Sequence, residues 1–402
     1  MRKILALALV LLLLSLPVFA SALTLTMGSW RADDVEQMNA FLNAYKEASG
    51  VEILFQPINP PEYNANIRLQ LESGTGPDLL YSRSYATGRE LYDAGFVADL
   101  SDVEGLMQNY TANSRDPWTA SDGSPFAVPF AAVSHSMYYN KDIFAANDLA
   151  VPTTWDEFLA VCEALKAAGV TPLANGVADE WDILECFFLG MLPNYVGGAE
   201  ERVKYQNGEK PLNDEAFLAA YTDFAMIAPY LDEIFSAMTY NDSQVMFGSG
   251  RAAMFMDGSW TCGTYGDSGL EWSVFAIPAR DAADTAVCFH LDMAIAANAA
   301  SPNLEEAKKF LNWGASEDGA NAAGKFMPAG FFPMIELPAT IENPHAAEIY
   351  ALNEGKVTDT RFIWPALTDL YVPMNIEIIK LLKGEVTPQE AADAVQAVFE
   401  GL

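Results

Sequence analysis

Residues 23–55 read LTLTMGSWRADDVEQMNAFLNAYKEASGVEILF and decide the fold class. The stretch opens with a short apolar run at 23–27, which predicts a strand. Apolar residues then recur at helical spacing up to Gly50, which predicts an amphipathic helix that ends at that glycine. Residues 51–55 predict a second strand. This alternation of strand, helix and strand is typical of an α/β sheet.

The same order continues along the chain. A helix around 67–71, a strand at 78–81 and a helix at 89–94 complete a β-α-β-α-β series, which predicts a parallel or mixed sheet with helices on both faces. Further on, Thr154-Trp-Asp-Glu157 is a capping box that starts a helix, and Thr387 starts the last one. We find no internal repeat and no linker rich in Pro, Gly or Ser. We therefore expect two α/β lobes joined by several short crossings.

Composition and charge exclude several classes of function. The 402 residues include 54 acidic and 22 basic side chains, for a net charge of −32. So acidic a surface repels phosphate backbones, so we expect no nucleic-acid partner. The chain has only three histidines and four cysteines, which is little material for a zinc or haem centre. We therefore expect no metal site and no cofactor.

The first 22 residues predict a secretory signal peptide. Arg2 and Lys3 precede an apolar run, and Ala20-Ser-Ala22 offers a cleavage site after Ala22 or after Ala20. No cysteine follows the apolar run, so the sequence offers no site for a lipid anchor. We expect a periplasmic protein.

The four cysteines would then meet an oxidising compartment. Pairing between neighbours, Cys162 with Cys186 and Cys262 with Cys288, is the expected arrangement. Buried free thiols are the alternative, and the sequence does not decide between them.

No catalytic motif stands in a suitable context. The chain lacks GxSxG, HExxH, a P-loop and a GxGxxG after a strand. Glycoside hydrolases use a pair of carboxylates. Among 54 acidic residues such pairs are expected by chance, so they do not indicate a hydrolase. We expect a binding protein and no enzyme, with a secreted carbohydrate-active hydrolase as the alternative.

Tryptophans in loop-like settings suggest what is bound. Trp30, Trp181, Trp260 and Trp364 each lie near glycine, proline or hydrogen-bonding residues at predicted element ends. The C–H face of a sugar ring stacks on indole, while polar side chains bind its hydroxyls. Each tryptophan alone is also explained as a partly buried packing residue. Together they favour a carbohydrate site.

Several motifs, in order, carry a resemblance to a known family. They are GSPFAVPF at 123–130, YYNKDIF at 138–144, VPTTWDEF at 151–158 and FGSGRAAMFMDGSW at 247–260. With them the chain resembles the bacterial extracellular solute-binding proteins of carbohydrate-uptake ABC transporters (family 1), relatives of maltose-binding protein. This resemblance implies a monomeric protein that captures a sugar or oligosaccharide and delivers it to a membrane permease.

The resemblance also implies an architecture. It is a two-lobed periplasmic-binding-protein fold of the type II kind, with the ligand cleft between lobes joined by about three hinge crossings. Lobe one would comprise 23–133 and 292–334, and lobe two 137–290 and 335–402. A peptide, a polyamine or a polyol phosphate is the alternative cargo for the same fold.

Within that family pattern Trp260 matches a stacking tryptophan, and Trp181 and Trp364 fall close to two further aromatic platforms. Three scarce arginines lie beside the tryptophans and could donate paired hydrogen bonds to vicinal hydroxyls; surface ion pairs are the alternative for each. The ligand-binding residues expected on these grounds are Trp30, Arg31, Ser82, Arg83, Trp181, Trp260, Asp292, Arg361 and Trp364.

Overall fold

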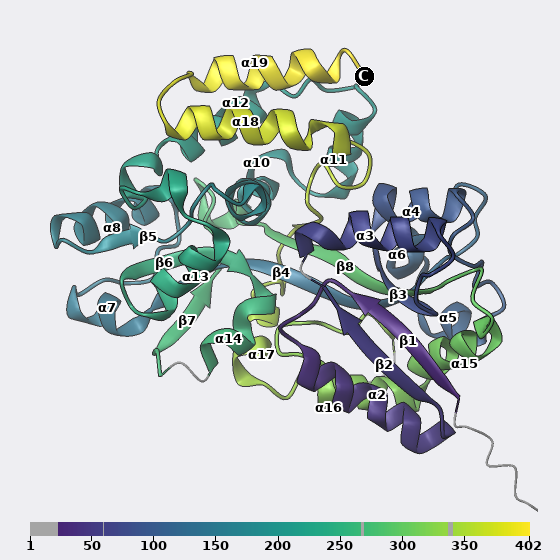
Figure 1. Ribbon diagram of the computed structural model, residues 1–402. Helices are drawn as coiled ribbons and strands as arrows, with labels where there is room; N and C mark the ends of the chain where they lie inside the picture. Colours follow the sequence, from purple (N-terminus) through teal and green to yellow (C-terminus); the bar gives the residue numbers. More distant parts are fainter. Residues whose placement is uncertain (1–22, 59, 267–268, 337–340) are drawn as a thin grey trace, which may run out of the picture.

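The computed structural model describes residues 23–58, 60–266, 269–336 and 341–402, and confirms the expected mixed α/β, two-lobed fold (Figure 1). The expected signal peptide lies outside the described residues. The strands follow the order β2-β1-β3-β8-β4-β6-β5, with β7 on β4 and β9 on β8. Their bounds are β1 Thr24–Ser29, β2 Glu52–Pro57, β3 Leu79–Arg83, β4 Val128–Asn140, β5 Thr171–Leu173, β6 Ala252–Gly258, β7 Trp272–Phe275, β8 Val287–Ala297 and β9 Thr358–Asp359.

One lobe, on the right in Figure 1, is built on β1, which pairs in parallel with both β2 and β3. The expected first helix is α2, whose face of Met38, Phe41, Leu42 and Tyr45 is buried. It ends at Gly50, which takes the left-handed conformation that glycine adopts without strain. The helices of this lobe are α2 Val35–Ser49, α3 Pro60–Glu72, α4 Tyr85–Asp93, α5 Glu104–Asn109, α6 Ala112–Arg115, α15 Leu304–Gly314 and α16 Glu317–Phe326.

The other lobe, on the left and top in Figure 1, is mostly helical around β5, β6 and β7. The last helix starts at Thr387 as expected, and there Thr387 and Glu390 each accept from the other's backbone. The expected capping box at Thr154 forms only in part: Thr154 accepts from the Glu157 backbone, but Glu157 accepts from the backbone and hydroxyl of Thr153. The helices are α7 Lys141–Ala146, α8 Trp155–Ala167, α9 Leu189–Met191, α10 Pro193–Val196, α11 Ala199–Gln206, α12 Glu215–Ala225, α13 Tyr240–Gly248, α14 Cys262–Gly266, α17 Pro344–Ala351, α18 Tyr371–Leu382 and α19 Pro388–Phe399.

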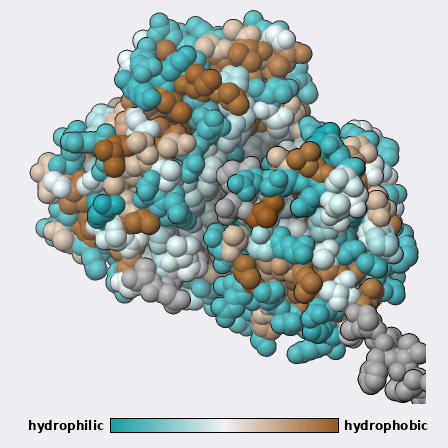
Figure 2. Space-filling model, in the orientation of Figure 1, coloured by the Kyte–Doolittle hydropathy of each residue, from teal (hydrophilic) through white to brown (hydrophobic). Residues whose placement is uncertain are grey.

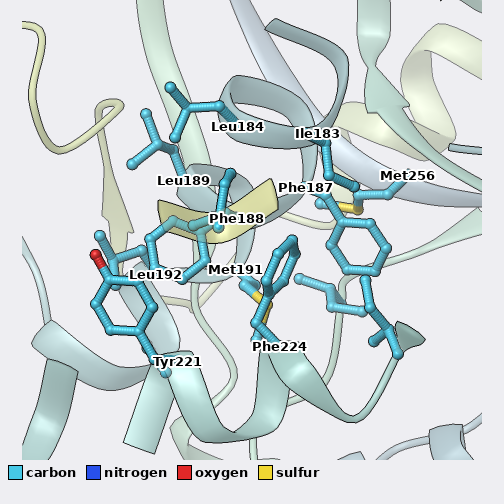
Figure 3. Packing of buried hydrophobic residues seen from close by; sticks show 14 of the residues in the cluster. Ile183, Leu184, Phe187, Phe188, Leu189, Met191, Leu192, Tyr221, Phe224 and Met256 are labelled. Carbon is cyan, nitrogen blue, oxygen red and sulfur yellow. The ribbon is translucent and has the colours of Figure 1, made fainter. Parts of the chain in front are cut away.

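A π-helical segment, η2 at Asp182–Phe188, passes through the core of this second lobe. Figure 3 shows Phe187 and Phe188 of this segment directed at Phe224 of α12. Their ring centroids lie 5.6 and 5.1 Å from that of Phe224. Wide turns of this kind are rare and are frequently found at functional sites. Here the segment fixes the polar residues Asp182 and Glu185 within an otherwise apolar core.

Two long strands belong to both lobes. β4 pairs with β8 through its first half, where Val133 lies opposite His290, and with β6 and β7 through its second half. On its other edge β8 runs antiparallel to β3, with Arg83 opposite Met293. A separate bridge joins Ala132 to Phe332. Residues near these strands therefore lie where the two lobes meet.

The apolar cores follow the same division. One cluster contains buried residues from Leu25 to Val133 and from Met293 to Phe331, and a second contains residues from Met137 to Ile277 and from Phe362 to Val395. A smaller third cluster lies around β6, β7 and α17. In Figure 2 the surface is hollowed where the lobe on the right meets the rest of the molecule.

The expected pairing of neighbouring cysteines is wrong. Cys162, Cys186, Cys262 and Cys288 are all free and buried, so the alternative of buried thiols is the correct one. The two members of each expected pair come from different elements: α8 and η2 hold one pair, and α14 and β8 the other. Among the described residues, no helix combines the length and apolar character needed to span a membrane.

Candidate functional site

Three of the four expected tryptophans come together. Trp181 precedes η2, Trp260 lies in a single 3-10 turn after β6, and Trp364 follows β9. The rings of Trp181 and Trp260 are 6.2 Å apart between centroids. The Arg361 guanidinium carbon lies 5.5 Å from the Trp260 ring and 4.8 Å from the Trp364 ring. All three indoles are half-buried, so each combines a packed side with an accessible one.

The orientation of Trp260 is set by its own chain and by a tyrosine. A Cβ at Gly258 would lie 2.0 Å from the Trp260 ring, so the indole folds back over a position that only glycine leaves open. The indole Nε1 donates a 2.8 Å hydrogen bond to the hydroxyl oxygen of Tyr240. The Tyr240 hydroxyl in turn donates a 2.9 Å hydrogen bond to Asp257. The centroid of the Tyr240 ring lies 3.8 Å from that of the Trp181 ring. Tyr240 therefore contacts two of the three tryptophans.

Arg361 is paired inside the protein and is not a surface residue. It forms an ion pair with Glu185 of the π-helical segment, and the two side chains are 5% and 10% exposed. Burial is the largest single effect and lowers the pKa of Arg361, but the charges of Glu185, Asp292 and other neighbours together outweigh it, and the net shift is upward. The guanidinium is thus a fixed cation held against two indoles.

Trp30 lies in the first lobe in a different setting. It is 3% exposed and packs edge-on against Tyr63 and Tyr81 at 5.5 and 5.3 Å. The Arg83 guanidinium covers its ring at 3.8 Å. Trp30 is therefore a packing residue whose ring supports the Arg83 guanidinium. At this point the first lobe presents the cation of Arg83, and not an indole face, towards the second lobe.

The side chains of Arg31 and Ser82 are also engaged in contacts within the first lobe. Arg31 forms an ion pair with Asp34, and its guanidinium carbon is 5.1 Å from the Phe331 ring. Ser82 is fully buried, and its hydroxyl donates to the Arg83 carbonyl at 3.2 Å. Ser82 thus supports the strand end from which Arg83 projects.

The charges of the two lobes act on one another at Arg83. Burial lowers the pKa of Arg83, whereas Asp292 of β8 and Glu185 of the second lobe raise it. Arg361 of the second lobe lowers it further. Asp292 is 7% exposed. Cationic and anionic groups from both lobes therefore face one another around the three tryptophans.

Two carboxyl groups behind the tryptophans have perturbed acidity. Burial raises the pKa of Asp182 to about 7 and that of Asp257 to about 8. Asp182 accepts from Asn175 at 2.8 Å, from the Gly176 backbone at 3.0 Å and from Ser243 at 2.7 Å. Such buried, fully bonded acids act here as supports for the site.

Sequence reasoning missed several of these residues, among them Glu185, Tyr240, Asp257 and His135. Tyr240 and His135 contact Trp260 only through the fold, and Glu185 reaches the site through its pair with Arg361. Asp257 is the one that a local signal could have indicated, because it precedes the glycine and serine before Trp260.

Comparisons with known proteins agree with this architecture. The family model described as "Bacterial extracellular solute-binding protein" matches residues 29–321. The chain is 24% identical to the multiple sugar-binding protein of Streptococcus mutans over 316 residues, which is 76% of this chain and 73% of that protein. It is 27% identical to the maltotriose-binding protein of Pyrococcus abyssi over 233 residues, or 57% of this chain and 47% of that protein.

Solved structures resemble the fold over almost the whole chain. The bacterial solute receptor AcbH, described as preferring β-D-galactopyranose, has a TM-score of 0.82 at 17% identity, covering 94% of this chain and 98% of its own. The solute-binding protein RafE in complex with raffinose has a TM-score of 0.78 at 18% identity, with coverage of 94% and 98%. At such identities the likeness concerns the fold alone.

Proposed function

The chain belongs to the family of bacterial extracellular solute-binding proteins, and on that premise we propose that it is the substrate-binding component of an ABC transporter for a sugar or oligosaccharide. The observation that carries the proposal is the grouping of Trp181, Trp260 and Trp364 around the Arg361–Glu185 pair. Indole faces stack on sugar rings, and charged planar groups bind hydroxyls in pairs. A relative is named for sugars and another for maltotriose, which supports the same class of ligand.

The ligand would bind between the lobes. Lobe one, 23–133 and 292–334, would contribute Arg83, with Trp30, Arg31 and Ser82 behind it, and Asp292. Lobe two, 137–290 and 335–402, would contribute the three tryptophans and Arg361. Because groups on both lobes would contact one ligand, binding would favour the closed arrangement of the lobes.

Charge balance favours a neutral sugar over a polyamine. A tightly bound polyamine needs several unpaired carboxylates, whereas Glu185 is paired with Arg361 and Asp34 with Arg31. Arg83, which stands close to Asp292, would also repel a polycation. We further propose that the protein works as a monomer in the periplasm after cleavage of residues 1–22, without a lipid anchor and without enzymatic activity.

The test is a thermal-shift and calorimetric screen against raffinose, maltotriose and galactose, with spermidine and a dipeptide as the other cargo classes. A ligand at 100 times its Kd should stabilise the protein by about 2.7 kcal/mol. The bound sugar should be recovered intact. Stabilisation by spermidine alone would overturn the sugar assignment, and recovered hydrolysis products would favour the hydrolase.

A further inference from the structure

Two buried histidines link the tryptophans of this site. His135 lies on β4 and His290 on β8, the two strands shared by both lobes. Their imidazoles stack with centroids 5.5 Å apart and planes inclined by 27°. His135 meets Trp260 edge-on at 5.4 Å, and His290 lies 5.7 Å from Trp364. The four rings form one row that runs from Trp260 to Trp364.

Neither histidine ring is held by a polar side chain in the part of the chain that the structure describes. All four ring nitrogens are buried without a hydrogen bond of good geometry, and each residue is 1% exposed. Only the backbone of Cys186 acts on the His135 ring, and that of Leu291 on the His290 ring, to favour protonation. The backbone of α9 closes over His135, because a Cβ at Gly190 would lie 3.7 Å from its Nδ1. A neutral imidazole tolerates such a position at moderate cost, whereas a charged one does not.

The surrounding charges also oppose protonation. The titratable or charged groups on the elements packed around the pair are Asp182, Glu185 and Cys186 of η2, Asp257 of β6, Cys288 and Asp292 of β8, Arg83 of β3, and Arg361 after β9. Burial lowers the pKa of both imidazoles well below 6.5, and the Arg361 charge lowers it further. Among these carboxylates, Glu185 is already paired with that arginine.

We propose that His135 and His290 are positioning residues that make sugar capture dependent on pH: their neutral rings hold Trp260 and Trp364 at the spacing of the closed protein, and a proton on either ring favours the open, unloaded protein. The inference rests on the proposed function. When the lobes separate, water reaches the rings and their pKa returns towards 6.5. Closure therefore releases protons. The affinity for sugar is highest above about pH 6.5. It falls as the pH drops below that value, by up to about tenfold per pH unit for each titrating histidine.

The first experiment compares the free protein with the protein saturated by whichever of raffinose, maltotriose and galactose binds. The chain contains only three histidines, His135, His290 and His345, so ring-¹⁵N NMR of histidine-labelled protein resolves each, and His345→Gln assigns the third signal. The expected result is that both rings titrate at about pH 6.5 in the free, open protein and stay neutral at pH 5.5 in the loaded protein. The same titration of both rings with and without sugar would overturn the proposal.

The second experiment measures affinity from pH 8 to pH 5 by tryptophan fluorescence, with raffinose, maltotriose and galactose as probes. His135→Phe/His290→Phe keeps two rings in the row without a titratable group and should abolish the acid-induced loss, while His345→Phe should keep it. Should the double variant not fold, His290→Phe alone should halve the slope. An unchanged pH profile in a folded variant would refute the positioning role. If no probe binds at any pH while both rings of the free protein titrate at about pH 6.5, the sugar assignment fails and the titratable histidine pair stands.

Discussion

The indole Nε1 of Trp260 donates a 2.8 Å hydrogen bond to the hydroxyl oxygen of Tyr240, which itself donates to Asp257. The hydroxyl is also an acceptor for Gln244 at 3.0 Å. One phenol thus fixes the angle of Trp260, which is expected to stack on the ligand. Its ring packs against Trp181, so two platforms depend on one residue.

Tyr240→Phe should therefore weaken sugar binding while the fold is retained. The variant keeps the ring against Trp181 but leaves the Trp260 N–H and the Asp257 carboxyl without this partner. Loss of a buried hydrogen bond costs about 1–3 kcal/mol, so we expect roughly tenfold weaker binding and a lower Tm. Calorimetry beside a thermal melt separates the two effects, and Tyr92→Phe, on a 3.4 Å bond to Asp122, is the surface control. Full affinity in Tyr240→Phe would mean that the hydroxyl does not orient the indole.

Gly258→Ala should displace Trp260 without removing it. The added methyl group would fall 2.0 Å from the indole, so the ring must swing out. We expect a loss of affinity close to that of Trp260→Ala, where removal of an anchoring aromatic costs about 2 kcal/mol or more, some thirtyfold in Kd. Gly263→Ala, five residues on with nothing within 4 Å of its added Cβ, is the matched control. Equal affinity in the two glycine variants would argue against Trp260 as a platform.

The fold was predictable from sequence because its signals are local. The helical spacing that ends at Gly50 depends on residues a few positions apart, and the structure places Met38, Phe41, Leu42 and Tyr45 on the buried face. The start of the last helix at Thr387 is equally local. Such periodicity survives without knowledge of tertiary contacts.

The site was predictable only in part, because its pairings are long-range. Trp181, Trp260 and Trp364 were found as tryptophans at element ends. Their partners Glu185 and Tyr240 are unremarkable in sequence, and contact depends on a π-helical turn and on α13. Trp30 carried the same local signature as the others, yet it packs within the first lobe under Arg83. Sequence identifies the residue types, and tertiary packing decides which of their faces remain free.

Asp182 and Asp257 should make the protein less stable as the pH rises. Their pKa values of about 7 and about 8 in the folded state lie above the ordinary 3.8, so the folded state binds more protons than the unfolded state between these limits. The free energy of unfolding then falls with rising pH, by at most about 1.4 kcal/mol per pH unit for each group. Asp182→Asn should flatten this slope between pH 5 and pH 7 in urea titrations.

A surface carboxyl provides the contrast for that experiment. The Ser124 backbone and other donors lower the pKa of Asp122, so its contribution is present at neutral pH and lost in acid. Asp122→Asn should leave the slope from pH 5 to pH 7 as in the wild type. A wild-type slope in Asp182→Asn would show that this carboxyl is ionised throughout.

The four cysteines should be unreactive in the folded protein. All are buried, and burial raises the pKa of Cys262 and of Cys288 to about 12. The thiolate is the reactive species, so native protein should give no rapid reaction with a thiol reagent, and unfolded protein should give four equivalents. Fewer than four after unfolding without reductant would reveal a disulfide.

Replacing Arg361 alone should lower the free energy of unfolding strongly, whereas replacing Arg361 and Glu185 together should lower it little. The pair is buried, so Arg361→Met leaves Glu185 as an uncompensated charge and also strips a cation from two indoles. We expect a loss of about 3–5 kcal/mol in the free energy of unfolding. Arg361→Met/Glu185→Leu should recover most of that stability, since apolar groups of similar volume often replace a buried pair without loss.

Arg68→Met, which breaks a surface pair with Glu72, is the control and should change stability by less than about 1 kcal/mol. Sugar affinity should stay low in the double variant, because the planar donor against Trp260 and Trp364 is gone. Recovery of affinity together with stability would show that Arg361 serves the fold and not the ligand.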